Sequence, residues 1–187
     1  GTNGSLGAIT ITGALDLDAA LTSATSLSVS TTSNLGANVT TSSTQTYTGA
    51  VTLSGGDRTL TGSTVNFVST LAGGTNALTV TGNLDLDDAA TGLSTLDVSG
   101  TSNLGADVTT SSTQTYTGAV TISTDGVTLT TTNSQITFSS TVNSEASEAN
   151  ALNISVGSSE VEFDGIIGGG TNGSLGAITI TGALDLD

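Results

Sequence analysis

The chain has 187 residues and is strongly acidic: sixteen Asp and Glu residues face one basic residue, Arg58, for a formal net charge of −15. Phosphate groups are bound mainly by Lys and Arg, so this composition excludes nucleic acid and anionic membrane surfaces as partners. The absence of Cys and His excludes disulfides, thiol chemistry and ordinary zinc or copper sites. No apolar run is long enough to insert into a membrane as a spanning helix.

The chain begins and ends with the same sequence. Residues 1–18, GTNGSLGAITITGALDLD, return without change as residues 170–187, a shift of 169 positions. A chain that returns to its own beginning is typical of stacked or extended repeat architectures. We therefore expect residues 1–169 to form one unit of a tandem array and residues 170–187 to start the next identical unit.

A second repeat lies inside this unit. Residues 33–54 recur as residues 102–123 with two substitutions, a shift of 69 positions. The unit is thus an internal duplication, with halves at 13–81 and 82–169. The second half is the longer one, and we expect its extra residues, around 143–150 and 160–173, to form a surface loop and an inserted turn of structure.

Along the chain, short segments of the form apolar-x-apolar end at Gly or Thr. Alternation with a period of two predicts half-buried strands, whereas no segment shows the 3.6-residue rhythm of an amphipathic helix. Within each half the closing residues lie 18 positions apart. They are Gly13, Thr31 and Gly49 in the first half, and Gly82, Gly100 and Gly118 in the second.

An 18-residue strand period distinguishes between two kinds of all-β fold. Sandwiches and propellers repeat by hairpin or by blade of about 40 residues, whereas each coil of a parallel β-solenoid has about three short strands. The absence of Pro suits uninterrupted ladders of backbone hydrogen bonds. We predict a parallel β-helix with roughly seven or nine coils in each unit, depending on how the long gaps are counted, and a rise of about 34–43 Å.

The alternation also predicts which side chains point into the core. With only three Phe and two Tyr, the core must consist mostly of branched aliphatic residues, which pack well on a pleated surface. Tyr47 and Tyr116 are expected at equivalent inward positions, near Val29 and Val98. The other predicted inward residues are Ile9, Ile11, Leu15, Leu17, Leu27, Val29, Val51, Leu53, Val65, Phe67, Leu78, Val80, Leu84, Leu86, Leu96, Val98, Val120, Ile122, Ile136, Phe138, Leu152, Ile154, Val161 and Phe163.

Aspartates cluster in two related segments, LDLDAA at 15–20 and LDLDDAA at 84–90. Inward leucines place alternate aspartates on one outer face, where carboxylates about 7 Å apart could share a hard cation such as calcium. Diffuse attraction of cations and simple solvation are the two alternatives. The candidate metal ligands are Asp16, Asp18, Asp85, Asp87 and Asp88, and no cofactor other than calcium is expected.

Two further features of the surface involve threonine and arginine. Thr-x-Thr pairs occur at residues 10–12, 46–48, 79–81, 115–117 and 179–181, and stacked on one flat face they would resemble the arrays of ice-binding solenoids. Threonine is also an ordinary polar strand residue. Arg58 beside Asp57 is the only candidate for catalysis of the kind that polysaccharide-cleaving β-helices perform. It has no counterpart in the second half, so we expect a turn residue and no enzyme.

The runs TQTYTGAVTL at 44–53, repeated with a final Ile at 113–122, and STVNFVSTLAGGTNALTV at 63–80 resemble the β-strand repeats of filamentous haemagglutinin-like proteins. The resemblance is one of repeat style and covers nearly the whole chain. It implies a right-handed parallel β-helix in a large secreted or surface-attached bacterial protein that acts as an adhesin, matrix fibre or stalk.

Two functional hypotheses follow. The preferred one is a structural segment of an extracellular or cell-surface fibre or giant adhesin, with neighbouring repeat units of the same protein as its partners. The alternative is a binding module that recognises a carbohydrate, a mineral or ice through its outward Thr and Asp residues. The absence of Trp argues against an aromatic sugar platform.

Overall fold

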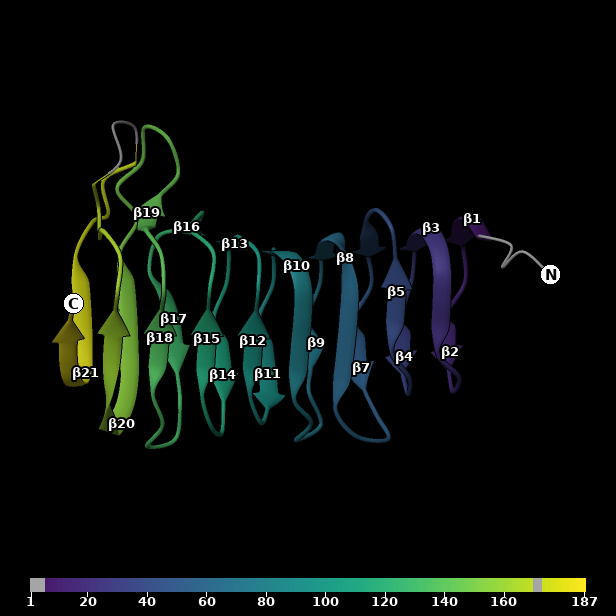
Figure 1. Cartoon of the computed structure of the whole chain (residues 1–187), viewed down its shortest axis with the longest axis horizontal. Helices are drawn as coiled ribbons and strands as arrows, with labels where there is room; N and C mark the ends of the chain where they lie inside the picture. The colour runs from purple at the N-terminus through teal and green to yellow at the C-terminus, as the bar shows by residue number, and fades with distance from the viewer. Residues whose placement is uncertain (1–5, 170–172) are drawn as a thin grey trace.

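The computed structural model describes residues 6–169 and 173–187, in which all regular secondary structure is β-strand. Strands account for 57% of the chain. Figure 1 shows the strands stacked side by side along one long axis, with the chain advancing steadily from one end of the stack to the other. The predicted all-β fold, a parallel β-helix, is confirmed.

The strands are short except where two consecutive segments join across a corner. They are β1 Leu6–Ile11, β2 Leu15–Leu17, β3 Leu21–Val29, β4 Ser33–Leu35, β5 Val39–Thr41, β6 Gln45–Tyr47, β7 Val51–Leu53, β8 Arg58–Phe67, β9 Leu71–Ala72, β10 Leu78–Leu86, β11 Ala90–Leu93, β12 Leu96–Val98, β13 Ser102–Leu104, β14 Val108–Thr110, β15 Gln114–Tyr116, β16 Val120–Ile122, β17 Val127–Thr130, β18 Ile136–Phe138, β19 Val142–Ser144, β20 Leu152–Phe163 and β21 Ile178–Leu186.

Each coil contributes three strand segments, and each segment pairs in parallel with the corresponding segments of the coils before and after. Three faces result, which we name by their inward columns. The first face carries Ile9, Leu27, Gln45, Val65, Leu84, Ser102, Val120, Val142 and Ile167. The second carries Leu15, Ser33, Val51, Leu71, Ala90, Val108, Leu129, Ile154 and Ile180. The third carries Leu21, Val39, Leu60, Val80, Val98, Tyr116, Phe138, Phe163 and Leu186.

Nine residues in every column mean nine stacked coils in the described part of the chain. One 169-residue unit spans 25 strand segments, or eight and one third coils, which is closer to the predicted nine than to seven. The gap from Gly49 to Gly82 contains five strand segments, which is nearly two coils. Elsewhere, some strands have only one apolar inward residue. In β5 the inward pair is Val39 and Thr41, and in β6 it is Gln45 and Tyr47. The apolar-x-apolar pattern does not describe such strands.

The core is a narrow column that runs the length of the stack. Of the predicted inward residues, those from Leu27 onward are buried, and Ile9, Ile11, Leu15 and Leu17 of the first coil are half-buried against the core. The tyrosines have the predicted neighbours: Tyr47 pairs with Val29, and Tyr116 pairs with Val98. Aromatic rings also stack, with Tyr47 5.4 Å from Phe67 and Tyr116 5.3 Å from Phe138 between ring centroids.

The repeats do not coincide with whole coils. Tyr47 lies on the first face in the third coil, whereas its counterpart Tyr116 lies on the third face in the sixth coil. Likewise Ile11 lies on the first face of the first coil, and its counterpart Ile180 lies on the second face of the ninth coil. Identical sequence is therefore turned about the axis from one copy to the next.

Candidate functional site

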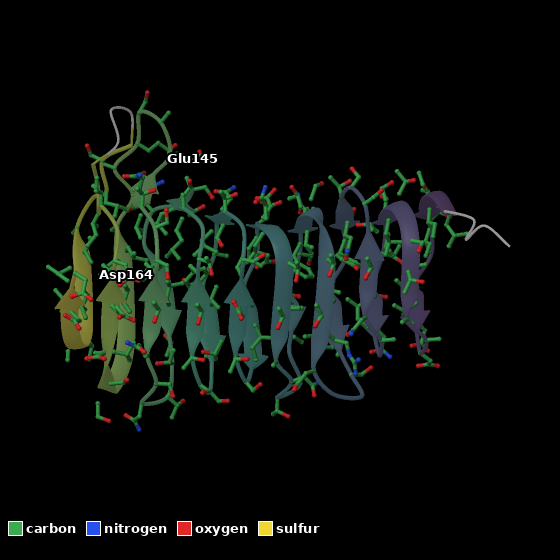
Figure 2. All side chains as sticks on the ribbon, in the orientation of Figure 1. Glu145 and Asp164 are labelled. Atoms are coloured by element: carbon green, nitrogen blue, oxygen red, sulfur yellow. The ribbon has the colours of Figure 1, made fainter. Side chains whose placement is uncertain are left out.

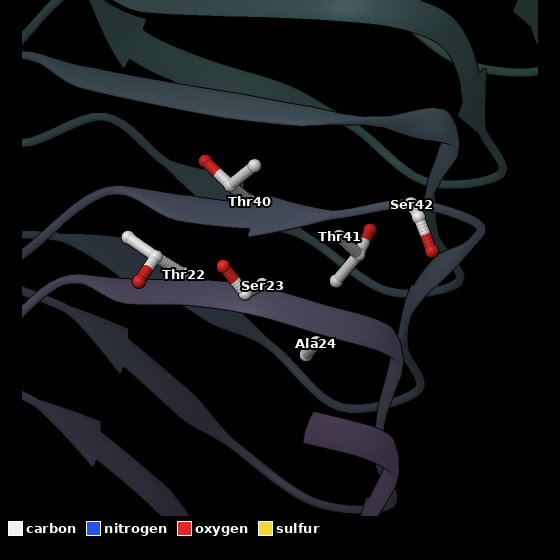
Figure 3. A pocket seen from close by; sticks show the side chains of 6 residues that line it. All are labelled: Thr22, Ser23, Ala24, Thr40, Thr41 and Ser42. Atoms are coloured by element: carbon white, nitrogen blue, oxygen red, sulfur yellow. The ribbon is translucent and has the colours of Figure 1, made fainter. Parts of the chain in front are cut away.

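Among the described residues, a groove of about 230 Å³ lies between two adjacent coils, at the corner between the third and first faces. Figure 3 shows Thr22, Ser23 and Ala24 from one coil facing Thr40, Thr41 and Ser42 from the next. The lining is made only of hydroxyl, methyl and backbone groups. It carries no charge and no aromatic ring, so it could contact a small neutral group but offers no acid, base or metal ligand.

A backbone irregularity produces this groove. The register of β3 against β5 shifts between Leu21 and Ala24, and Ser23 within the shift has a left-handed φ of 65°. A second groove of about 170 Å³ has the same origin: β11 shifts register between Ala90 and Leu93, with Gly92 also at a φ of 65°. Ser23 and Gly92 occupy the same position in the two halves of the unit, so the internal duplication has copied the bulge together with the sequence.

A buried polar network adjoins the first groove and shares Thr41 with its lining. Gln45 is fully buried, and its Nε2 donates to the Thr61 carbonyl at 2.8 Å, while the Tyr47 hydroxyl donates to Gln45 Oε1 at 3.0 Å. Thr41 Oγ1 donates to the Ser43 carbonyl at 2.8 Å. The same network recurs around Gln114 and Tyr116. Because these polar atoms are already paired with each other, they hold the corner in place and none of them points free into the groove.

Burial also changes the acidity of the two tyrosines. Desolvation raises the pKa of Tyr47 and of Tyr116 well above the ordinary value of 10.0. Both hydroxyls therefore stay protonated at neutral pH and act as hydrogen-bond donors to glutamine. Neither tyrosine is available as a proton acceptor near neutral pH.

The structure separates the predicted aspartate ligands into two distant groups. Asp16 lies on the second face in the first coil, and Asp85 lies on the first face in the fifth. Each is paired with asparagine from a neighbouring coil: Asn34 Nδ2 donates to Asp16 Oδ1 at 2.8 Å, and both Asn66 and Asn103 donate to Asp85 at 2.9 Å. In Asp85, both carboxylate oxygens are thus already engaged by amide donors.

The remaining predicted ligands lie at the ends of these strands. Asp18 and Asp87 are exposed, and Asp88 is half-buried with its Oδ1 accepting from the Ala89 amide at 2.7 Å. Desolvation and, less strongly, the charge of Asp85 raise the pKa of Asp87. The Asp16–Asp18 group and the Asp85–Asp88 group do not come together, so no single site contains all five.

A different set of carboxylates does converge among the described residues. Glu162, Asp164 and Asp187 place one carboxylate oxygen each within 4.8 Å of one another, on the last two coils, where Figure 2 labels Asp164. Glu162 also accepts from Thr137 Oγ1 and Gln135 Nε2, both at 3.1 Å. These oxygens are of the kind that hold a hard cation. The sequence alone did not indicate this cluster because Asp187 belongs to the second copy of the repeat.

The Thr-x-Thr pairs do not form one array. Residues 10–12 and 46–48 lie on the first face, 79–81 and 115–117 on the third, and 179–181 on the second. On the third face, Thr59 pairs with Thr79 and Thr115 pairs with Thr137, and Asp97 separates the two pairs in the same row. Rotation of the repeats disperses pairs that the linear sequence suggests would align.

Arg58 belongs to a corner. Its Nε and Nη2 donate to the Ser54 carbonyl at 3.1 and 2.8 Å, closing the loop at residues 54–58. The adjacent Asp57 accepts from the Ala77 amide of the next coil at 2.8 Å. Equivalent bonds to the next coil, which the sequence pattern did not reveal, are made by Asn38, Asp107 and Asp125. Side-chain oxygens at corners thus continue the ladder where the strands break.

No family model, curated protein or solved structure matches this chain. Within residues 6–169 and 173–187, the structure contains no helix with the length and apolar character needed to cross a membrane.

Proposed function

We propose that the chain is a structural segment of an extracellular fibre or large surface adhesin, in which it forms part of a continuous β-solenoid shaft. One observation carries this proposal. β21 belongs to the second copy of the repeat, and it stacks on β20 through the same parallel pairing that joins coils elsewhere. The hydrogen-bond ladder and the core therefore pass through the repeat boundary without a cap.

The mechanism of such a shaft is the stacking itself. Each coil donates and accepts one set of backbone hydrogen bonds on each side, and the buried column makes every coil part of its neighbour's core. Asparagine and aspartate add side-chain bonds between coils, as in the Asn34 to Asp16 pair. Stiffness along the axis is then shared by many weak contacts.

Composition supports a location outside the cell. Arg58 is the only site that a trypsin-like protease could cleave, and the chain has no Cys or Met that oxidation would damage. The resemblance to filamentous haemagglutinin-like repeats supports an adhesin or fibre as the parent protein. Within such a parent we assign this segment to the shaft, because its two grooves are neutral and the buried glutamines and tyrosines that adjoin them are already paired.

The proposal is tested with recombinant tandem chains of one, two and three 169-residue units, each followed by residues 170–187. A continuous solenoid should lengthen by about 40 Å for each added unit at constant width, measured by small-angle scattering and electron microscopy. Units that form separate globules or a collapsed particle would contradict it.

A matched control interrupts the ladder at one junction. Replacing the two inward leucines that follow the repeat boundary, equivalent to Leu184 and Leu186, by Asp buries charge between coils and should produce a bend or break at that junction. The flanking units should keep their length. A rod that stays straight would mean that the junction is not part of the continuous core.

A further inference from the structure

The LDLD motif occurs three times in the chain, and each copy lies on a different face. Residues 15–18 are on the second face, residues 84–87 on the first and residues 184–187 on the third. The first and last of these are the same position in successive 169-residue units. Corresponding residues of successive units are therefore separated by eight full coils and one further strand segment, which places them on the next face.

The copies lie on different faces because coils differ in length, so a fixed number of residues does not correspond to a fixed number of coils. Stacked positions are 18 residues apart between Leu78 and Leu96, but 26 apart between Leu152 and Ile178, because corners absorb the inserted residues. What stays constant is three segments for each coil. The unit contains 25 segments, counted from Ile9 to Ile178 along the three columns, and 25 is not a multiple of three.

The fold tolerates this rotation because the three faces are chemically alike on the inside. The segment that contains Tyr47 and its copy that contains Tyr116 fill a first-face and a third-face position with the same paired neighbours, Val29 and Val98. Any segment with two inward side chains of suitable volume can occupy any face. The sequence thus specifies the inward pattern without fixing the face.

We infer that successive units in the tandem array are turned by one face, about 120°, around the solenoid axis. The same residues then return to the same face only after three units, which is 25 coils or about 120 Å at 4.8 Å per coil. This inference rests on the proposed shaft. It implies that a fibre of identical units presents every surface feature on all three faces. A partner that binds along one face would find the same feature only once in about 120 Å.

The loop after β19 can serve as a marker for the orientation of each unit. It leaves the stack at the corner between the first and second faces, and residues Glu145 to Ala149 are all exposed. Figure 2 shows Glu145 on a projection that stands clear of the ladder. In the array this acidic loop should project in three directions in turn.

The experiment uses a six-unit tandem chain with Ala146→Cys in every unit, labelled with maleimide-linked gold. The natural chain has no Cys, so no other position reacts. Labels on successive units should lie at three angular positions, about 40 Å apart along the axis, with units one and four superposed in angle. A single straight row of labels at the same spacing would overturn the inference.

A control in the 187-residue chain shows what aligned labels look like. Thr32 and Ala146 lie at the same corner, in the second and eighth coils, so Thr32→Cys with Ala146→Cys should place two labels parallel to the axis, about 29 Å apart. The outcomes separate the two proposals. A chain that forms no rod contradicts the shaft, whereas a rod with one row of labels contradicts only the rotation.

Discussion

At the scale of single residues, the core combines aliphatic packing with buried glutamine–tyrosine pairs. Tyr116 and Gln114 are completely buried, and Tyr116 donates to Gln114 Oε1 at 3.0 Å. The next residue along the chain, Thr117, is exposed. The side chain thus changes from buried to solvent-exposed between adjacent positions. The same substitution at residues 116 and 117 should therefore have very different effects on stability.

Tyr116→Asp should destabilise the fold by about 3–5 kcal/mol, because it removes a packed ring and buries a carboxylate among apolar side chains. Thr117→Asp, the matched control, should change stability by no more than about 0.5 kcal/mol. Denaturant titrations of the two variants measure the difference. Equal tolerance at both positions would show that the inward register is incorrect.

The buried tyrosines also predict a loss of stability in alkali. Unfolded tyrosine ionises near pH 10, whereas burial raises the pKa of Tyr47 and Tyr116 in the folded chain. Above about pH 10 the unfolded state therefore binds fewer protons than the folded state, and the free energy of unfolding should fall by about 1.4 kcal/mol per pH unit for each tyrosine. Below that pH these groups should produce no dependence.

This alkaline window is simple to measure because the chain has no Lys or Cys that would titrate there. Thermal melts between about pH 8 and pH 12 give the slope. The double variant Tyr47→Phe/Tyr116→Phe should be less stable overall but should lose the slope. If the slope persists in that variant, another group is responsible.

At the scale of elements, the corners decide how strands join. Gly13 and Gly82 are the same position in the two halves of the unit. A Cβ added at Gly13 in the first coil would meet only open space. Gly82 instead has a φ of 135°, and a Cβ there would overlap the Gly62 carbonyl oxygen of the preceding coil. Equivalent positions of the repeat thus differ in whether the surrounding structure requires glycine.

Gly82→Ala should therefore cost about 1–3 kcal/mol from overpacking against the backbone, with additional strain from the positive φ. Gly13→Ala should be close to neutral. Chemical denaturation of both variants tests the contrast. A neutral Gly82→Ala would indicate that the corner within β10 relaxes without cost.

At the scale of the whole molecule, charge opposes compactness. Fifteen excess negative charges lie along one narrow rod, so the folded chain repels itself. Asn66 and Asn103 reduce this locally by donating to Asp85, but most carboxylates have no cationic neighbour because Arg58 is the only basic side chain.

Salt should accordingly stabilise the fold. Raising NaCl from about 10 mM to about 150 mM shortens the Debye length from about 30 Å to about 8 Å, and the melting temperature should rise by about 2–4 °C for each kcal/mol gained. Calcium at matched ionic strength should add little at Asp16, Asp18, Asp85, Asp87 and Asp88, because these aspartates do not converge. A saturable extra shift with calcium, abolished by Asp85→Asn or by Asp187→Asn, would instead identify a specific site.

Much of this architecture could be predicted from the sequence. Alternation in segments such as Leu78 to Val80 determined that strands form and which side chains point inward, because a strand has only two faces and water selects between them. The repeat period indicated coils. The prediction failed where Gln45 or Thr41 occupies an inward position, because a buried hydrogen-bonded polar residue looks like a surface residue in the sequence.

The tertiary structure alone decided which residues become neighbours across coils and on which face each repeat lies. Asp187 meets Glu162 and Asp164, and the Thr-x-Thr pairs separate onto three faces, because corners of variable length change how many residues complete a coil. The sequence by itself determined a stacked all-β scaffold through its local alternation and composition. Two distant segments share a face only if the number of strand segments from one to the other is a multiple of three. That number can be counted only in the folded structure.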